Sequence, residues 1–201
     1  MSHAYQDHYF HRAKRESYRA RAVYKLDEIQ KKHKLLRTGS RVLDLGAAPG
    51  SWVQLASTIV GPNGLIVGVD LKAIDPGFPE HVVLYQGDIF DEAFLETVST
   101  RHGLFDVVLS DMAPATSGIR SADSARSELL FEQALVIVER MLRPGGHFLG
   151  KIFQGSEFHT LLLEVKKAFG KVKVVKPGAS RKESKEIYIL GMHYRKKSQG
   201  G

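Results

Sequence analysis

The chain has no cysteine, a single tryptophan among its 201 residues, and no long run of apolar residues. Without cysteine it cannot form disulfide bonds, thiolate metal sites or a cysteine nucleophile. No apolar stretch approaches the roughly 18 residues that a membrane-spanning helix needs, and residues 1–16 lack the apolar core of a signal peptide. We therefore expect a soluble protein that is located in the cytoplasm and does not associate with membranes.

The overall composition is that of a globular protein. Hydrophobic residues make up 43% of the chain and charged residues 25%, which excludes disordered and collagen-like classes. A chain of this length supports one domain with a real core. We expect a single domain over residues 1–201, with a basic extension and helix at 1–37 and a mobile tail at 195–201.

Charge is distributed unevenly along the chain. The net charge is +6 over residues 1–37, −8 over 38–165 and +9 over 166–201, for a total of +7. If the fold brings the two ends together, they form one positive face that can bind a nucleic-acid backbone. The alternative is that these charges are solvated lysines and frayed tails.

Strand-like and helix-like segments alternate, which predicts an α/β fold with a mostly parallel sheet and helices on both faces. Turn signals at 61–64 and 143–146 precede two of the strands. Helices are expected at 17–34, after Gly50, around Ile74, at 91–100 and at 127–142. Seven strands are expected at 41–45, 65–70, 82–86, 105–110, 146–152, 172–175 and 186–194.

The segment 41–52, RVLDLGAAPGSW, reads as an apolar strand followed by a glycine turn that opens a helix. In an open α/β sheet, ligands bind at the carboxyl ends of strands, where glycines such as Gly50 let a backbone approach the ligand. Ala48 stands where the dinucleotide fingerprint has its second glycine. A nicotinamide cofactor is therefore disfavoured.

Two aspartates end the next strands. Asp70 suits the two hydroxyls of an adenosine ribose, and Asp88 suits the exocyclic amine of an adenine. Each could instead be a helix cap. Together with the glycine turn, they resemble the class I S-adenosylmethionine-dependent methyltransferases, which implies a Rossmann-like sheet of seven strands, an antiparallel last strand, and S-adenosylmethionine as cofactor.

Further charged residues are expected at the same edge. Asp111 follows a strand and precedes MetAlaPro, and Lys151 lies inside an apolar strand. A buried ammonium needs a partner or a lowered pKa, unless its stem packs on the sheet while its head reaches water. Glu186 opens the last strand with Tyr188 on the same face, and Lys25 lies on the first expected helix.

With these residues the resemblance becomes specific. The chain resembles the FtsJ-type ribosomal RNA 2′-O-methyltransferases over essentially its whole length, through YRARAVYKL, LDLGAAPG, SDMAP, GKIF and SKEIY. The resemblance implies 2′-O-methylation of a ribose, at a uridine in bacterial relatives, in RNA of the large ribosomal subunit. It implies a catalytic tetrad of Lys25, Asp111, Lys151 and Glu186. It also implies cofactor contacts at Gly50, Trp52, Asp70, Asp88 and Asp111.

The expected chemistry is proton removal from a ribose hydroxyl held in line with an electrophilic methyl group. We expect Lys151 to be the base or to stabilise the alkoxide, with Lys25 as a neighbouring positive charge and the two carboxylates orienting the amines. A second cation lowers the pKa of a lysine whereas carboxylates raise it, and the sequence leaves this balance open. No metal site is expected, because no pattern such as HxxxH occurs and Asp111 is not followed by another acid.

Both basic blocks adjoin expected catalytic residues, and Arg19 and Arg21 are predicted to contact RNA. The aromatic residues among them are expected to pack the helix onto the sheet. We expect a monomer whose partner is ribosomal RNA within the large subunit. Related enzymes with the same tetrad act on transfer RNA or on messenger caps, so these remain alternative substrates. Two other readings are a non-enzymatic RNA-binding assembly factor and, less favoured, a dehydrogenase.

Overall fold

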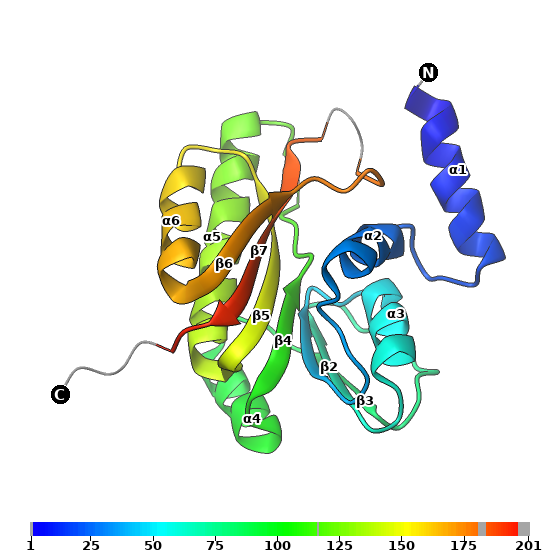
Figure 1. Cartoon of the computed structure of the whole chain (residues 1–201). Helices are drawn as coiled ribbons and strands as arrows, with labels where there is room; N and C mark the ends of the chain where they lie inside the picture. Colours follow the sequence, from blue (N-terminus) through cyan, green and yellow to red (C-terminus); the bar gives the residue numbers. More distant parts are fainter. Residues whose placement is uncertain (1, 116, 181–183, 197–201) are drawn as a thin grey trace.

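The structure is a computed structural model that describes residues 2–115, 117–180 and 184–196. A single seven-stranded sheet has the order β3-β2-β1-β4-β5-β7-β6 (Figure 1). Its strands are β1 (Arg41–Leu45), β2 (Leu65–Asp70), β3 (Val82–Gln86), β4 (Phe105–Ser110), β5 (Leu142–Phe153), β6 (Phe169–Val175) and β7 (Glu186–Tyr194). The first five strands pair in parallel, while β7 runs antiparallel to both β5 and β6. The expected fold class is confirmed.

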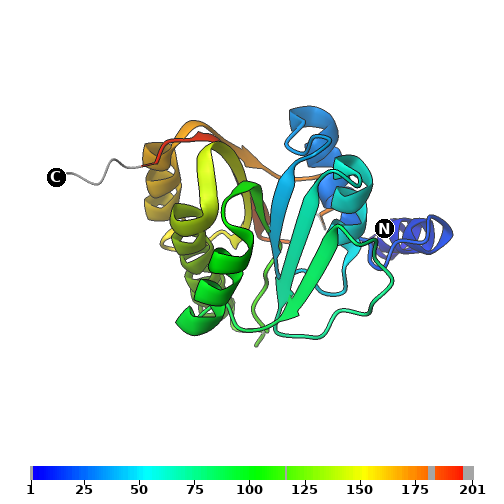
Figure 2. The same cartoon turned by 90° about the horizontal axis from the view of Figure 1, so that it is seen from below.

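Helices cover both faces of the sheet (Figure 2). Side chains alternate along each strand, so that Val42 packs with α2 and α3 while Leu43 packs with α4, α5 and α6. Two apolar layers result, and together they hold the sheet between the helices. The helices are α1 (Ser2–Arg15), α2 (Val23–His33), α3 (Ser51–Val60), α4 (Glu92–His102), α5 (Arg120–Met141) and α6 (Phe158–Ala168).

The helix that the sequence predicted at 17–34 begins later in the structure. The expected helix at 17–34 begins only at Val23, because Ser17 adopts a left-handed backbone conformation with φ +59° and the next residues form turns. Before it lies α1, which charge patterning did not reveal. The segment 17–22 is therefore an irregular connection, and its contacts become important below.

Three other helix predictions also need correction. The segment around Ile74 is not helical, because Pro76 and Pro79 interrupt it with residues that lack a backbone donor. Helix α5 begins at Arg120 rather than at residue 127, and α6 was not predicted.

The turn at 143–146 interrupts the pairing of β5 with β4, since Leu142 pairs with Phe105 and His147 already pairs with Val107.

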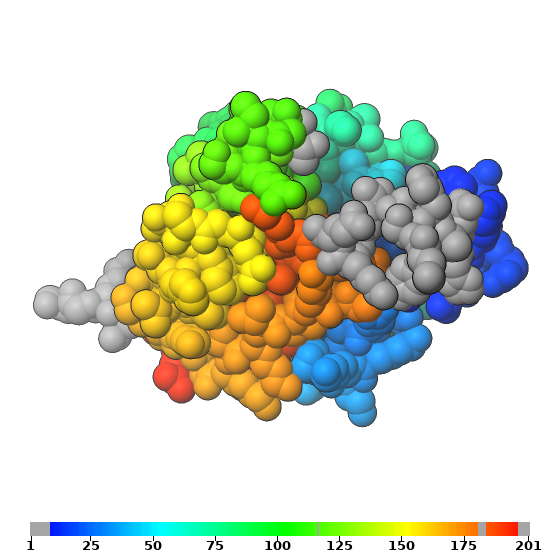
Figure 3. Space-filling view, turned by 90° about the horizontal axis from the view of Figure 1, so that it is seen from above, coloured from blue at the N-terminus to red at the C-terminus, as the bar shows by residue number. Residues whose placement is uncertain are grey.

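Helix α2 meets the connection between β6 and β7 at the edge of the sheet where the parallel strands end. Glu28 of α2 accepts hydrogen bonds from the backbone N–H groups of Gly178 at 2.6 Å and Ala179 at 3.0 Å. Figure 3, which looks onto this edge, shows the blue N-terminal segment beside the orange segment that leads from β6 to β7. Parts of the two basic blocks are thus neighbours here, whereas β7 runs antiparallel to β5 and carries the chain on to the opposite edge of the sheet.

The sequence also led to predictions about membrane-spanning helices and about the C-terminal tail. No helix in the described ranges is long and apolar enough to cross a membrane. The tail expected at 195–201 lies mostly outside the described residues, and the backbone N–H of Arg195 donates to the carbonyl of Ala168 at 2.7 Å.

Candidate active site

The structure brings the four expected catalytic side chains together. Lys25 stands in the first turn of α2, Asp111 directly follows β4, Lys151 lies in β5, and Glu186 opens β7. The Nζ atom of Lys25 lies 2.6 Å from Oε1 of Glu186. The Nζ atom of Lys151 lies 3.0 Å from Oδ1 of Asp111 and also donates to the backbone carbonyl of that residue. Each lysine is therefore paired with one carboxylate.

Tyr188 links the two ion pairs. Its hydroxyl donates to Oδ1 of Asp111 at 2.6 Å and lies 3.5 Å from Oε1 of Glu186. Burial, followed by the charges of Asp111 and Glu186, raises the pKa of Tyr188 well above its usual range, so the hydroxyl keeps its proton. Alternation along β7 predicted that Tyr188 shares a face with Glu186, but the sequence did not place it in the site.

The pairs are shielded from water. The side chain of Lys151 is 5% exposed and that of Lys25 is 11% exposed. A buried ammonium is costly without a partner, which Asp111 and Glu186 supply here. The alternative in which the head of Lys151 reaches solvent does not hold, and the ammonium sits at the carboxyl edge of the sheet with its charge directed at Asp111.

Asp44 of β1 is a member of this edge that the sequence did not single out. Its side chain is buried, and neither carboxyl oxygen has a hydrogen-bond partner in the described part of the chain. Burial, with smaller contributions from Asp111 and Asp70, raises the pKa of Asp44 well above its usual range. The signal in the sequence was an acid inside an otherwise apolar strand.

The aspartates expected to bind a cofactor are fixed by backbone groups. Asp70 accepts the N–H of Ala48 at 2.9 Å on one oxygen and that of Lys72 at 2.8 Å on the other. Asp88 accepts the N–H of Phe90 at 2.9 Å. Each carboxylate oxygen has a second lone pair. Neither aspartate has the helix-cap role considered as an alternative, since Asp91 caps α4; the loop hydrogen bonds orient acceptors that can also hold a ligand.

Gly50 and Trp52 form the start of α3. Gly50 caps the helix with φ +103°, a conformation that favours glycine. The indole of Trp52 is buried, donates to the carbonyl of Ala22 at 2.8 Å and packs with its ring centre 5.9 Å from that of Tyr188. The group that Trp52 can offer to a ligand is thus its backbone N–H, which has no partner within the first turn of a helix.

These residues fit S-adenosylmethionine chemically. An adenosine presents hydroxyl and amine donors, and a methionine presents an ammonium and a carboxylate. The edge supplies carboxylate acceptors at Asp44, Asp70 and Asp88, and N–H donors at the start of α3. The unpartnered carboxyl of Asp44 is the strongest sign of a missing donor, because buried polar groups are normally satisfied.

The two arginines predicted to contact RNA both lie in the segment before α2. Both terminal nitrogens of the Arg19 guanidinium donate to backbone carbonyls, those of Pro49 at 3.2 Å, Asp75 at 2.7 Å and Pro76 at 2.7 Å. Arg21 is half-buried in the turn before α2. The guanidinium of Arg19 is therefore engaged by backbone groups of the protein itself.

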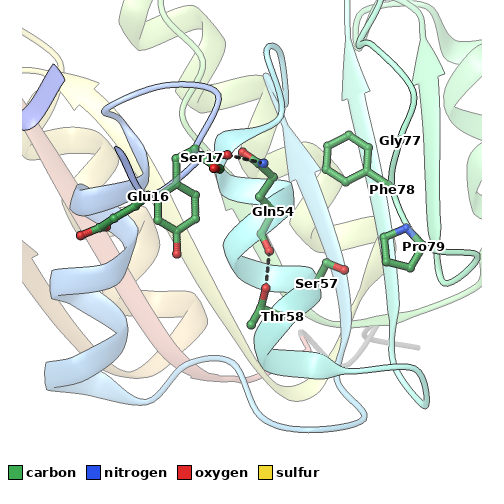
Figure 4. A pocket seen from close by; sticks show the side chains of 9 residues that line it. Glu16, Ser17, Gln54, Ser57, Thr58, Gly77, Phe78 and Pro79 are labelled. Atoms are coloured by element: carbon green, nitrogen blue, oxygen red, sulfur yellow. Dashed lines mark hydrogen bonds between the residues drawn. The ribbon is translucent and has the colours of Figure 1, made fainter. Parts of the chain in front are cut away.

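A groove lies beside Arg19, on the outer side of α3 (Figure 4). It encloses about 340 Å³. Segments 16–18 and 77–79 form its two walls, and Gln54 joins the first wall to α3 by donating from Nε2 to the carbonyl of Ser17 at 3.2 Å. Its lining residues are Glu16, Ser17, Tyr18, Gln54, Ser57, Thr58, Gly77, Phe78 and Pro79.

Within the described residues, no group of three or more histidine or acidic side chains is arranged to hold a metal ion. The positive charges of the site come from lysines instead, at the positions that the sequence predicted.

Comparisons with known proteins agree with this site. A model of the FtsJ-like methyltransferase family matches residues 18–194. The ribosomal RNA large subunit methyltransferase E of Syntrophobacter fumaroxidans is 64% identical over 98% of this chain and 100% of its own length. The protein of the same name from Methanothrix thermoacetophila is 51% identical over 95% of this chain and 74% of its own length.

A solved structure shows the same fold. The crystal structure of a protein described as a ribosomal RNA methyltransferase from Plasmodium falciparum superimposes with a TM-score of 0.77 at 28% identity. It covers 88% of this chain and 98% of the other. The sheet order, the paired lysines and carboxylates and the match over most of the chain lead to one conclusion: the chain belongs to the FtsJ-like methyltransferase family.

Proposed function

We propose that this protein transfers a methyl group from S-adenosylmethionine to a ribose 2′-hydroxyl, that of a uridine, in RNA of the large ribosomal subunit. The observation that carries the proposal is the buried network in which Tyr188 joins the Lys151–Asp111 pair to Glu186, the partner of Lys25. The names of the most similar relatives support ribosomal RNA as the substrate.

The cofactor would be held by the strand ends. When bound, S-adenosylmethionine supplies an electrophilic methyl carbon. Asp70 would accept the ribose hydroxyls, Asp88 the adenine amine, and Asp44 together with Asp111 the ammonium group. The backbone N–H of Trp52 in the first turn of α3 would bind the carboxylate, and Gly50, whose own N–H donates to the carbonyl of Ala47 at 2.7 Å, would shape the turn that lets the ligand approach.

Lys151 has the geometry of a base. To act as a base, the Lys151 ammonium must first release one proton to solvent; the neutral amine then carries two N–H bonds and one lone pair, and two oxygens of Asp111 accept from its Nζ atom. With both N–H bonds directed at Asp111, the lone pair is left for the proton of the ribose hydroxyl. Once protonated, Nζ directs the new N–H at the substrate oxygen, while Asp111 stabilises the ammonium that has formed.

The other members of the network hold Asp111 in place. Tyr188 donates to the same oxygen that faces Lys151, which limits rotation of the carboxylate. Glu186 accepts from Lys25 and from the hydroxyl of Ser180 at 3.0 Å. Lys25 adds a positive charge to this edge and anchors α2, which brings the N-terminal basic segment beside the substrate.

RNA would lie across the edge where α2 meets the connection between β6 and β7. Arg21 precedes Lys25 on this side, and we propose that it contacts a phosphate. We further propose that the protein acts as a monomer and as one domain over residues 1–201, in the cytoplasm where ribosomes are assembled. Transfer RNA and messenger caps are alternative substrates for the same reaction, and an RNA-binding assembly factor without activity is the alternative function.

The test is transfer of a labelled methyl group to undermodified large subunits, naked ribosomal RNA and transfer RNA. We expect label in subunit RNA at one nucleotide whose linkage resists alkali, because a methylated 2′-oxygen cannot attack the phosphate. Lys151→Ala should lower transfer by about 10² to 10⁴ fold. Lys167→Ala, which removes an exposed lysine of α6 paired with Glu164, should leave transfer unchanged.

The other outcomes separate the alternatives. Label confined to transfer RNA would change the substrate and keep the reaction. Cofactor binding without label on any RNA would favour the assembly factor. Normal transfer by Lys151→Ala would remove the base assignment.

A further inference from the structure

We propose that Arg19 is a positioning residue for the cofactor half of the site and not an RNA contact. Its guanidinium fastens the connection between β2 and β3, residues 71–81, over Gly50. This inference rests on the proposed function, since it concerns binding of the same cofactor. It replaces the RNA-binding role that sequence predicted for Arg19 and leaves that role to Arg21.

The guanidinium of Arg19 is held from two directions. Its terminal nitrogens donate to the carbonyls of Asp75 and Pro76 in the β2–β3 connection and to that of Pro49 in the glycine turn. Its plane stacks on the ring of Phe78, with the central carbon 4.3 Å from the ring centre. A phosphate could take the donors of this guanidinium only by breaking bonds that join two loops of the fold.

The point at which these loops meet is Gly50. A Cβ atom added to Gly50 would lie 2.8 Å from the ring of Phe78 and 3.3 Å from both Cδ of Arg19 and Cγ2 of Ile74. The stem of Arg19 and the ring of Phe78 therefore close directly over the backbone that starts α3. The same connection begins at Asp70, whose carboxylate is set by the N–H of Lys72. Arg19 thus fixes the β2–β3 loop. One end of this loop is at Asp70, the proposed acceptor for the ribose hydroxyls, and its middle lies above Gly50 at the start of α3.

The backbone of Arg19 is fixed as well. Its N–H donates to Oε1 of Gln54 at 2.8 Å, and the amide nitrogen of Gln54 donates to the carbonyl of Ser17 (Figure 4). A little further along, the carbonyl of Ala22 accepts from Trp52. Segment 17–22 is therefore attached to the first turns of α3 independently of the Arg19 side chain, so Lys25 keeps its place when that side chain is removed.

Arginine is needed here for its shape. Three carbonyls and an aromatic face are engaged by one planar group with several donors in a fixed arrangement. A lysine carries the same charge but cannot span the carbonyls of Pro49 and Pro76 while stacking on Phe78. Arg19→Lys therefore separates the two roles, because it preserves charge toward RNA and removes the clamp on the loop.

The experiment measures binding of S-adenosylmethionine to the full chain without RNA, by calorimetry. We expect both Arg19→Ala and Arg19→Lys to raise Kd about tenfold, a loss equivalent to about one charge-assisted hydrogen bond. In methyl transfer, KM for the cofactor should rise by the same factor while kcat at saturating cofactor is retained. Arg15→Ala removes an equal charge from the end of α1, which has no hydrogen bond to this loop in the described residues, and should leave Kd unchanged.

RNA binding as a function of salt gives the opposing readout. If Arg19 only positions the loop, Arg19→Ala keeps the wild-type salt dependence, whereas Arg21→Ala lowers the slope by about 1. The inference is overturned if Arg19→Lys binds the cofactor as the wild type does, or if Arg19→Ala loses RNA affinity and salt dependence while its cofactor Kd is unchanged.

Hydrogen exchange of the free protein distinguishes failure of this inference from failure of the proposed function. Peptides covering 71–81 should exchange faster in both Arg19 variants than in the wild type and in Arg15→Ala. A wild-type protein that bound no S-adenosylmethionine would overturn the proposed function, and the exchange data would still decide whether Arg19 clamps the loop. Equal exchange in all four proteins would overturn the clamp itself.

Discussion

Lys25 and Glu186 lie 2.6 Å apart, although one stands near the start of the chain and the other near its end. Both side chains are nearly buried, at 11% and 12% exposure. The pair holds α2 against β7 at the edge where the strands end. Loss of this ion pair should therefore both destabilise the packing of α2 and disturb the geometry of the site.

A double-mutant cycle should reveal this coupling. Lys25→Met and Glu186→Gln each leave an unpaired group at a nearly buried position, so each should lower the free energy of unfolding by about 2 to 4 kcal/mol. The double variant leaves no unpaired charge and should lose about 1 to 3 kcal/mol less than the two single losses combined. Urea unfolding of the four proteins measures this difference. Additive losses would show that the contact contributes no stability.

Tyr188 should matter for the rate more than for cofactor binding. Tyr188→Phe removes the hydroxyl that restrains Asp111 and keeps the packing against Trp52, so we expect kcat to fall about tenfold while Kd for S-adenosylmethionine is unchanged. Tyr85→Phe is the matched control, because it removes a hydroxyl paired with His102 at 2.9 Å elsewhere in the sheet. Single-turnover kinetics would separate the variants. Equal rates would mean that Asp111 does not need this restraint.

Asp44 should make the cofactor-free protein less stable as pH rises. Its pKa is raised in the folded state by burial, so above the pKa of the unfolded chain the folded protein binds more protons than the unfolded one. The free energy of unfolding then falls with pH, by up to about 1.4 kcal/mol per pH unit for this one group. The loss begins near pH 4, where the unfolded carboxyl ionises, and continues until the folded carboxyl ionises too.

Asp44→Asn should remove that contribution, because an amide does not ionise. We expect the difference in unfolding free energy between Asp44→Asn and the wild type to grow in favour of the variant between pH 4 and pH 7. The variant should also bind S-adenosylmethionine more weakly, since the acceptor for its ammonium is gone. A pH-independent difference, measured by urea unfolding in a series of buffers, would contradict this account of Asp44.

Gly50 should tolerate no side chain. Gly50→Ala places a methyl group 2.8 Å from the ring of Phe78 in a backbone conformation that L residues rarely adopt. The loop above it must move, so Kd for the cofactor should rise by more than about tenfold, at a backbone cost of about 1 to 3 kcal/mol. Gly103→Ala has a similarly positive φ with no atom within 4 Å of the added carbon, and should show the stability loss alone. Unchanged affinity in Gly50→Ala would place the cofactor away from this turn.

The sequence by itself determined the order of the elements and the chemistry of the edge. The positions of all seven strands were predicted, because buried strands are short apolar runs bounded by turn residues. The acids after those strands and the lysine inside β5 stood out, since a charge in an apolar strand is costly without a partner. Asp111 and Lys151 could be recognised in this way, and the match of Lys25 and Glu186 to a family motif completed the set.

Only the tertiary structure decided which groups meet. It paired each lysine with one carboxylate, placed Tyr188 between them and left Asp44 without a partner, because such contacts depend on register and crossing elements rather than on local pattern. It also showed that α2 starts late, since Gln54 holds the backbone of Arg19 outside the helix. A basic residue near a catalytic lysine looks like an RNA contact in the sequence, and the three carbonyl partners of Arg19, on which our proposal of a loop clamp rests, are visible only in the tertiary structure.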